Sequence, residues 1–321
     1  MSELTIIGID NGNGNIKTKN ETFPCGYHMQ ETEPNKLFSK DILEYNGKFY
    51  TLTTNAFPYQ NDKTTDEKTY VLSLFGIAKE LIARNPNIAK EGFVGKEVLL
   101  AVGLPPAHFE KQAKNFKQYF LNYSNHGVQF KYNGATFSFY IKDVLVFPQD
   151  FAGAVIFKNE LLTMYSTSYC VDIGTGTTDL VGITNGMPDK DKMLSREIGM
   201  NKLRSMIIDD VINDYGVTLD DKTVEDFLAD RPVALAPEFA DKIKDRIAKT
   251  AMSFTTDLVN QLHSKVPDFR VFPTIFLGGG SIALKSYIEA TKAFGIVEFI
   301  PDINANAVGY ETMAKMKFQA K

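Results

Sequence analysis

The stretch DNGNGNIK at residues 10–17 decides the expected fold of this chain. It follows a short apolar run, Leu4–Ile9, and its glycines alternate with asparagines before the sequence turns apolar again. An apolar run, a glycine-rich turn and a second short run are typical of two strands joined in a hairpin. Because glycine has no Cβ and tolerates positive φ, the backbone N–H groups of such a turn can approach a phosphate closely. The same stretch is also typical of an ordinary hairpin turn, so on its own it leaves both interpretations open.

The pattern occurs a second time at residues 172–179, DIGTGTTD, roughly one domain length further along the chain. A buried strand is expected before it, at Tyr169–Ile173, and another after it, at Asp179–Ile183. Such an internal echo indicates two duplicated domains that face one cleft, where two glycine turns would hold one polyphosphate from both sides. The candidate contact residues of the two turns are Asn11, Gly12, Asn13, Gly14, Asn15 and Lys17, and Gly174, Thr175, Gly176 and Thr177.

Each glycine turn begins with an aspartate, Asp10 in the first turn and Asp172 in the second. Mg²⁺ prefers a few carboxylates, several waters and phosphate oxygens as its ligands, so both aspartates are suited to hold a hydrated magnesium ion. Lys17 is placed to reach a phosphate oxygen, although a solvated lysine on a strand would look the same in the sequence. Asp179 is expected to support the second turn rather than to contact the metal.

A third glycine-rich stretch, Gly278-Gly279-Gly280, follows the apolar run Thr274–Leu277. We expect a buried strand, a glycine turn and then a helix, at whose start Ser281 serves as a cap or as a ligand. The chain has no G-x-x-x-x-G-K-[ST] pattern, and the three glycines lack the spacing and the acidic partner of a dinucleotide-binding turn. The sequence therefore disfavours both of those nucleotide-binding folds.

The composition is that of an ordinary globular protein of 321 residues, with 44% hydrophobic and 23% charged residues. A net charge of −4 provides no overall attraction to nucleic acid or to an anionic membrane. The cysteines, Cys25 and Cys170, lie far apart, which predicts two free thiols in a reducing compartment. The sequence shows neither a signal-peptide pattern nor an apolar run of the roughly 18 to 20 residues that a membrane helix needs. We expect a cytoplasmic protein.

The order of the expected elements predicts a mixed α/β protein with two domains. The first domain is expected at residues 1–155, completed by residues 302–321, and the second at residues 156–301. Apolar spacing predicts a helix at Tyr70–Arg84, and Phe109–Phe120 is expected to form a further helix or a turn. Helices are also expected at Ala152–Leu162, Asn201–Tyr215 and Ala240–Ser264. Further strands are expected at Val98–Val102 and Val144–Phe147, with a hairpin at Phe130–Tyr140 around Asn133-Gly134.

Five pieces of the chain, in order, resemble the motifs of the actin, heat-shock chaperone and sugar-kinase superfamily. The two glycine turns are similar to its phosphate motifs, and Leu277–Ser281 is similar to its adenosine motif. Residues 146–150, VFPQD, resemble its first connecting segment, and residues 305–310, ANAVGY, resemble its second. The resemblance implies the actin-like ATPase fold, with two duplicated RNase H-like domains around a nucleotide cleft, and ATP and Mg²⁺ as cofactors. It leaves the choice between ATP and GTP open.

The resemblance also implies that the protein hydrolyses its nucleotide. Gln149 stands where actins carry glutamine and several plasmid-segregation relatives carry glutamate, and either side chain can orient a water in line with the leaving group. Gln149 and Asp172 are thus the expected catalytic residues of an ATP hydrolase, unless Gln149 merely caps the turn after Pro148. Asp150 leaves a second interpretation open, a small-molecule, sugar-type kinase in which an aspartate acts as the general base.

Within the superfamily, the chain resembles the bacterial actin-like plasmid segregation proteins, the ParM/StbA-like family. The resemblance rests on the chain length, on the Thr-rich loop near Lys63–Asp66 and on the Phe-Pro-Gln connecting segment. It implies dynamic filaments that grow with Mg-ATP and lose stability after hydrolysis, so the first partner is a second copy of the chain. A centromere-binding adaptor protein would be the other partner, which makes the contact with DNA indirect, and no membrane partner is expected.

Overall fold

The computed structural model describes residues 4–125 and 127–319, and it divides into two compact units. Unit 1 comprises Met1–Phe157 and Asn304–Lys321, and unit 2 comprises Lys158–Ile303. The C-terminal segment therefore returns to the unit in which the chain begins. Each unit contains one β-sheet and its own hydrophobic core, as expected for an α/β protein with two domains.

The sheet of unit 1 has nine strands in the order β3-β2-β1-β7-β9-β8-β5-β6-β4. Its centre is parallel, because β7 pairs in parallel with both β1 and β9, and the remaining pairs are antiparallel. The strands are β1 (Thr5–Asn11), β2 (Asn15–Lys17), β3 (Thr22–Pro24), β4 (Tyr27–Gln30), β5 (Ile42–Tyr45), β6 (Lys48–Leu52), β7 (Phe93–Leu104), β8 (Val128–Tyr132) and β9 (Ala135–Pro148).

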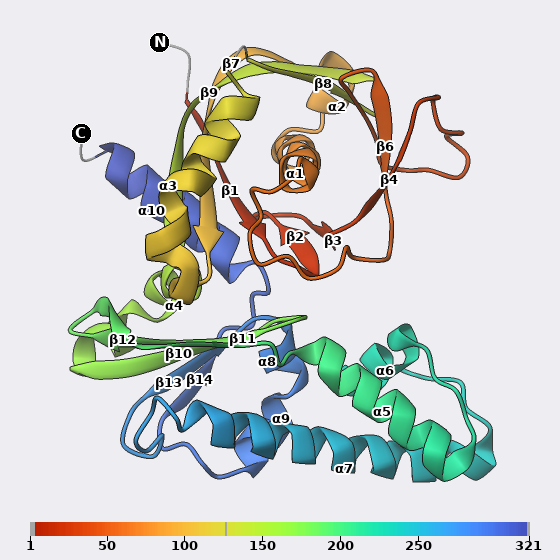
Figure 1. The fold of residues 1–321 in the computed structure, drawn as a ribbon, viewed down its shortest axis with the longest axis vertical. Helices are drawn as coiled ribbons and strands as arrows, with labels where there is room; N and C mark the ends of the chain where they lie inside the picture. Colours follow the sequence, from red (N-terminus) through yellow and green to blue (C-terminus); the bar gives the residue numbers. More distant parts are fainter. Residues whose placement is uncertain (1–3, 126, 320–321) are drawn as a thin grey trace. The chain divides into compact units, whose positions relative to one another are not determined.

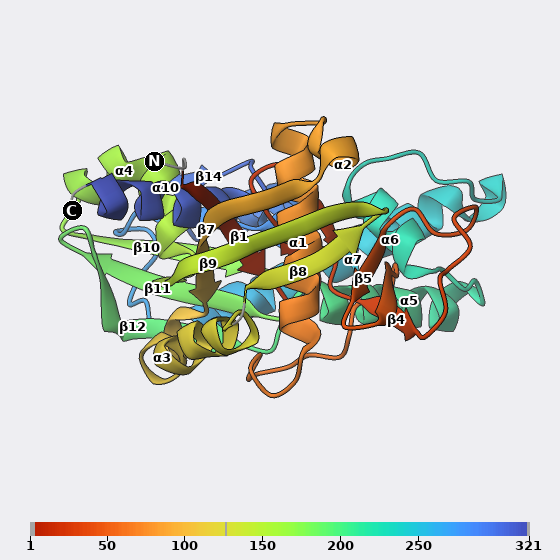
Figure 2. The same cartoon turned by 90° about the horizontal axis from the view of Figure 1, so that it is seen from above.

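Helix α1 (Lys68–Arg84) lies inside the curve of this sheet, as Figures 1 and 2 both show. Of its 17 residues 12 are buried, and a helix that is buried on nearly all sides needs apolar residues around its whole circumference. Helices α2 (Ile88–Glu91) and α3 (Pro106–Tyr123) complete this side of the unit. The core on this side includes Ile7 and Ile9 of β1 and Phe75 of α1.

Helix α10 (Ala305–Gln319) packs on the opposite face of β1 and β7. Because successive side chains of a strand point to opposite faces, Ile6 lies on this side, whereas Ile7 and Ile9 point towards α1. A Cβ at Gly8 would lie 2.1 Å from the Ala307 carbonyl oxygen, so only glycine allows helix and strand to approach this closely. The β1 strand thus has a packed helix on each face.

The sheet of unit 2 has five strands in the order β12-β11-β10-β13-β14. Its strands are β10 (Thr167–Ile173), β11 (Thr178–Thr184), β12 (Met187–Arg196), β13 (Thr274–Leu277) and β14 (Val297–Phe299). Its helices are α5 (Met200–Tyr215), α6 (Asp221–Leu228), α7 (Pro237–Leu262), α8 (Gly279–Ala283) and α9 (Lys285–Ala290). The core of the unit lies between the sheet and helices α5 and α7, as Figure 1 shows.

Several predicted elements are confirmed, among them the Asn133-Gly134 turn, where both residues have positive φ. Two predictions need correction. Val144–Phe147 is not a separate strand, because β9 runs without a break from the hairpin to Pro148. The helix expected at Ala152–Leu162 is α4 (Phe151–Met164), but its backbone leaves the helical region at Lys158, where unit 2 begins.

Cys170 is buried in the sheet of unit 2, and Cys25 is half-buried in unit 1. Across residues 4–125 and 127–319, no helix combines the length and the apolarity needed to cross a membrane.

Candidate functional site

The first glycine turn joins the end of β1 to β2. Asp10 pairs with Lys17 and Asn11 with Ile16 in the antiparallel ladder, so Gly12, Asn13 and Gly14 form the tip outside the strands. Asp10 and Asn11 are 5% and 2% exposed, whereas the tip residues are half-buried. A Cβ at Gly12 would lie 2.5 Å from the Asn15 carbonyl oxygen, so a larger residue would force the turn open. The turn is therefore tight, its two glycines carry no Cβ atoms, and it lies next to the buried carboxylate of Asp10.

Gln149 is brought to the same place from the end of β9. Its Nε2 donates a hydrogen bond of 2.8 Å to Oδ1 of Asp10, and its backbone N–H donates to the Leu104 carbonyl. The hydrogen-bond network assigns which end of the amide faces Asp10. The Oε1 atom at the other end is thereby directed away from the carboxylate and can accept a hydrogen bond from a water molecule.

The residue after Gln149 is held in an uncommon conformation. Asp150 has a φ of +64°, in the left-handed region that costs a residue with a Cβ roughly 1–2 kcal/mol. Its backbone N–H donates a 2.9 Å hydrogen bond to Oδ1 of Asn306, which is 5% exposed at the start of α10. Phe147 stacks on Tyr310 of the same helix, with ring centroids 6.2 Å apart and planes 7° from parallel. Helix α10 thus fixes the two ends of the connecting segment that carries Gln149.

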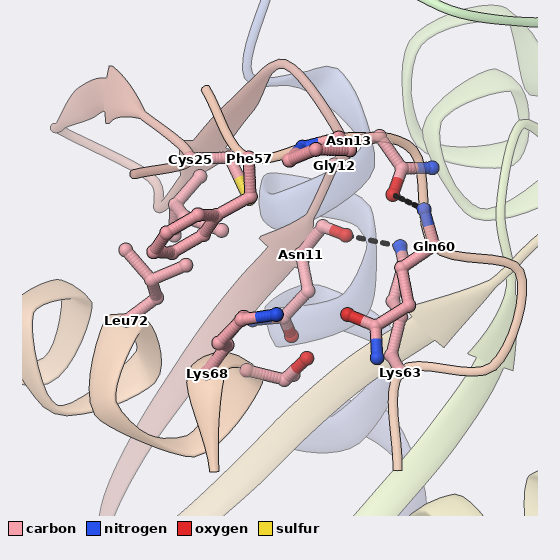
Figure 3. A pocket seen from close by; sticks show the side chains of 12 residues that line it. Asn11, Gly12, Asn13, Cys25, Phe57, Gln60, Lys63, Lys68 and Leu72 are labelled. Carbon is pink, nitrogen blue, oxygen red and sulfur yellow. Dashed lines mark hydrogen bonds between the residues drawn. The ribbon is translucent and has the colours of Figure 1, made fainter. Parts of the chain in front are cut away.

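A polar segment between β6 and α1, residues 53–67, also reaches the first turn, as the close-up in Figure 3 shows. The Lys63 ammonium donates to the Asn11 carbonyl, and the Gln60 backbone N–H donates to Oδ1 of Asn13 at 3.5 Å. The amide of Asn11 donates a 2.9 Å hydrogen bond to the Ser73 hydroxyl on α1. Side chains from three parts of unit 1 therefore meet around this turn.

The second glycine turn joins β10 to β11 in unit 2. Asp172 pairs with Asp179 in the ladder, and the Gly174 N–H donates a 2.8 Å hydrogen bond to the Thr177 carbonyl across the turn. The Thr177 hydroxyl donates a 3.0 Å hydrogen bond to Oδ2 of Asp179, which places Asp179 in contact with the turn that it was expected to support. The first residues of α5 complete the arrangement, because their N–H groups donate to the carbonyls of Gly174 and Thr175.

The third glycine stretch lies beside the second turn within unit 2. Gly278 has a φ of +85°, and a Cβ there would lie 2.0 Å from Oδ1 of Asp172. Only glycine fits, both because of the conformation and because of the carboxylate next to it. Gly279 is exposed, Gly280 is buried, and the Ser281 hydroxyl donates to the Leu277 carbonyl of its own chain segment. The Ser281 hydroxyl thus bonds back to the carbonyl four residues earlier, and the start of α8 has no side-chain cap.

Residues 8–151 match the family described as actin-like proteins, N-terminal domain. Over 97% of its length, the chain superposes on 99% of the archaeal actin homologue Ta0583 with a TM-score of 0.76 at 18% identity. The chain has an actin-like fold. The chain also resembles the apo pSK41 ParM protein, with a TM-score of 0.71 at 18% identity over 99% of both chains.

The chain resembles a filament structure as well. A 15-stranded ParM filament from Clostridium botulinum superposes with a TM-score of 0.71 at 19% identity, over 98% of this chain and 100% of that one. Ta0583 has also been solved in complex with ADP, and this form matches with a TM-score of 0.74 at 18% identity. A search of curated proteins finds no match. At these identities the likeness establishes the fold, which confirms the fold predicted from the sequence.

Two features of the candidate site escaped the sequence patterns. Lys63 is buried beside the first turn, although nothing in its polar segment singles it out. Glu80 of α1 is fully buried and accepts hydrogen bonds from Thr18, Asn20 and Arg84 at 2.6 to 2.9 Å, which fastens the chain just after β2 to the helix. Burial raises the pKa of Glu80, but these hydrogen bonds and the Arg84 charge outweigh it and hold the pKa below its usual value. A glutamate inside an apolar helix could have been recognised as such an anchor.

Proposed function

We propose that this protein binds one Mg-ATP with both glycine turns, hydrolyses it, and assembles with it into dynamic filaments that segregate plasmids. The observation that supports hydrolysis most strongly is the 2.8 Å hydrogen bond from Gln149 to Asp10. It places an amide that can orient water beside a carboxylate suited to a hydrated metal ion, at the base of a turn suited to phosphate.

The residues around the two turns fit a magnesium nucleotide. Carboxylates are the protein ligands that Mg²⁺ prefers, and Asp10 and Asp172 each stand where a strand enters a glycine turn. A Cβ at Gly12 would collide with the Asn15 carbonyl oxygen and one at Gly278 with Oδ1 of Asp172, so only glycine fits at either position. Lys17 and the turn residues would hold the phosphates, and the backbone of Gly278–Gly280 would face the nucleoside.

In the proposed reaction, most of the acceleration comes from positioning and charge neutralisation, because phosphoryl transfer requires little covalent chemistry from the protein. The Mg²⁺ ion, when bound, would neutralise negative charge on the phosphates. The Gln149 amide oxygen would accept a hydrogen bond from the attacking water, while its Nε2 is held by Asp10. The Asn306 side chain would keep the neighbouring backbone in place.

The finer role, plasmid segregation, is supported by the likeness to ParM structures, one of which is a filament. We propose that the chain associates with further copies of itself in the cytoplasm and contacts DNA through a centromere-binding adaptor. The net charge of −4 supports an indirect rather than a direct contact with DNA.

A sugar-type kinase is the competing function for this fold, with Asp150 as its general base. Asp150 is 1% exposed and sits in a backbone conformation that Asn306 holds. A base must come within hydrogen-bond reach of the substrate hydroxyl, so this burial favours hydrolysis over transfer.

The proposal is tested by adding Mg-ATP to the purified protein and measuring light scattering, sedimentation and phosphate release. We expect scattering and pelleted protein to rise at once, and phosphate release to follow with a delay. Mg-ADP serves as the control and should not sustain the pellet. A protein that stays monomeric, and that turns over ATP only when a sugar or another metabolite is added, would contradict the proposal and favour the kinase.

A further inference from the structure

Lys63 has an unusual position for a lysine. Within residues 53–68, all of which the structure describes, it is the one buried residue, at 7% exposure, and its neighbours are half-buried or exposed. Burying a charged ammonium is costly unless the surroundings compensate it. In this segment the aromatic and proline residues are more exposed to solvent than the lysine. The segment is therefore organised around the Lys63 ammonium.

The segment holds Lys63 through contacts on both sides. Oδ1 of Asp62 accepts hydrogen bonds from the backbone N–H and the hydroxyl of Thr64, at 2.9 and 2.7 Å, which fixes the turn around Lys63. The backbone N–H of Gln60 contacts Asn13, and the side-chain amide of Gln60 contacts Thr65 and Asp66. Figure 3 shows Gln60 and Lys63 approaching the same glycine turn side by side. The ammonium is thus directed at the turn by the chain on either side of it.

The ammonium donates to the Asn11 carbonyl, which belongs to the same peptide group as the Gly12 N–H. In a trans peptide the carbonyl and the N–H point in opposite directions. With ordinary peptide and hydrogen-bond dimensions, an anion bound by the Gly12 N–H would lie roughly 5–8 Å from Nζ. That separation is within the screening length of about 8 Å at physiological salt, and rotation of the flexible lysine stem can shorten it.

We infer that Lys63 makes the site favour a nucleoside triphosphate over the diphosphate, by adding a second cation, besides Lys17, within about 8 Å of a phosphate bound at the first turn. The inference rests on the proposed function, since it presupposes that the first turn binds phosphate. The terminal phosphoryl group adds negative charge that the diphosphate lacks, so a cation near it stabilises the triphosphate more. Lys63 is in this sense a specificity-determining residue, delivered by a segment outside the glycine motifs.

The test measures the affinities of the full chain for Mg-ATP and Mg-ADP by isothermal titration calorimetry, in wild type, Lys63→Met, Lys63→Arg and Lys68→Met. Lys68 is the matched control, because with Lys63 and Gly12 it lines the pocket of Figure 3, while its ammonium pairs with Asp66 at 3.0 Å. We expect Lys63→Met to weaken ATP binding at least about tenfold, or ~1.4 kcal/mol, and ADP binding far less. Lys63→Arg should retain most of the preference, and Lys68→Met should retain all of it.

Two results would overturn the inference while leaving the proposed function intact. One is a Lys63→Met protein whose ATP and ADP affinities both match wild type, and the other is an equal loss for both nucleotides. Should Lys63→Met not fold, as judged by its melting curve, the Lys63→Arg comparison decides: the charge explanation fails if that folded variant loses the ATP preference. If the wild-type protein binds neither nucleotide, this result contradicts the proposed function and therefore also the inference.

Discussion

Replacing Gln149 by alanine should separate nucleotide binding from hydrolysis. The variant loses the amide that the 2.8 Å contact with Asp10 holds in place, but it leaves both glycine turns and both aspartates intact. Loss of one preorganised polar group that acts on the reacting atoms typically slows a reaction about 10²- to 10³-fold. We therefore expect phosphate release to fall by about two orders of magnitude or more, with ATP affinity changed by less than a few-fold.

The same change should have a modest effect on stability. Asp10 is 5% exposed, and a buried acceptor that loses its hydrogen bond costs roughly 1–3 kcal/mol. A melting curve should accordingly show a lower Tm while the transition stays cooperative. Because hydrolysis is expected to destabilise the filaments, those formed by the variant with ATP should also persist longer than wild-type filaments.

The assay is single-turnover phosphate release at saturating Mg-ATP, with nucleotide affinity measured on the same preparation. Gln149→Glu is the informative companion, because it replaces the amide that faces Asp10 by a second carboxylate. A carboxylate can gain or lose a proton where an amide cannot, so the activity of this variant should depend more on pH than that of wild type. Phosphate release at the wild-type rate from Gln149→Ala would refute the reasoning and leave the glutamine a structural residue.

Three further predictions concern residues of unit 1. Asn306→Ala removes the acceptor of a buried backbone N–H, so it should cost roughly 1–3 kcal/mol in unfolding and slow hydrolysis while ATP affinity stays near wild type. The pKa of Glu80 is lowered in the folded state, so its contribution to stability is present above the unfolded value of about 4.5 and lost as the pH falls through the folded value. Glu80→Gln should therefore be less stable than wild type at pH 7, and the difference between the denaturant midpoints of the two proteins should narrow below pH 4.5. A difference that stays constant with pH would contradict this prediction. Leu37 and Phe38 are each 88% exposed between β4 and β5, and neighbouring exposed apolar residues mark contacts between protein molecules. Changing both to serine should leave Tm unaltered and raise the protein concentration above which filaments sediment. The control Val271→Ser should leave both quantities unaltered.

The sequence identified the parts of the site that depend on local chemistry. Glycine turns after short apolar runs carry a conformational signal, and Gly12 and Gly278 do stand where a Cβ would collide with oxygen atoms. The pairing of Gln149 with Asp10 joins positions 139 residues apart, and no periodicity encodes such a contact. The resemblance to actin-like motifs supplied Gln149, and the fold then placed it.

Other features could not be predicted because tertiary packing decides them. The polar pair Lys142-Asp143 interrupts the apolar pattern of β9, and this predicted a break between two strands. The ladder instead shifts its register there, pairing Val98 with Ile141 and Leu99 with Asp143, so the strand absorbs Lys142 as a bulge and continues. Lys63 likewise lies in a polar segment whose composition is typical of an exposed loop, and only the arrangement around the first turn buries it.

The central claim is that one nucleotide is held by both glycine turns, and calorimetric titration of Mg-ATP into wild type, Gly12→Val and Gly174→Val tests it most directly. Gly216→Ala, beyond the end of α5, is the control. We predict one ATP per chain in wild type and in the control, and a loss of affinity of at least about a hundredfold in each turn variant, roughly 2.7 kcal/mol. Two ATP molecules per chain, or full affinity in either folded turn variant, would contradict the account.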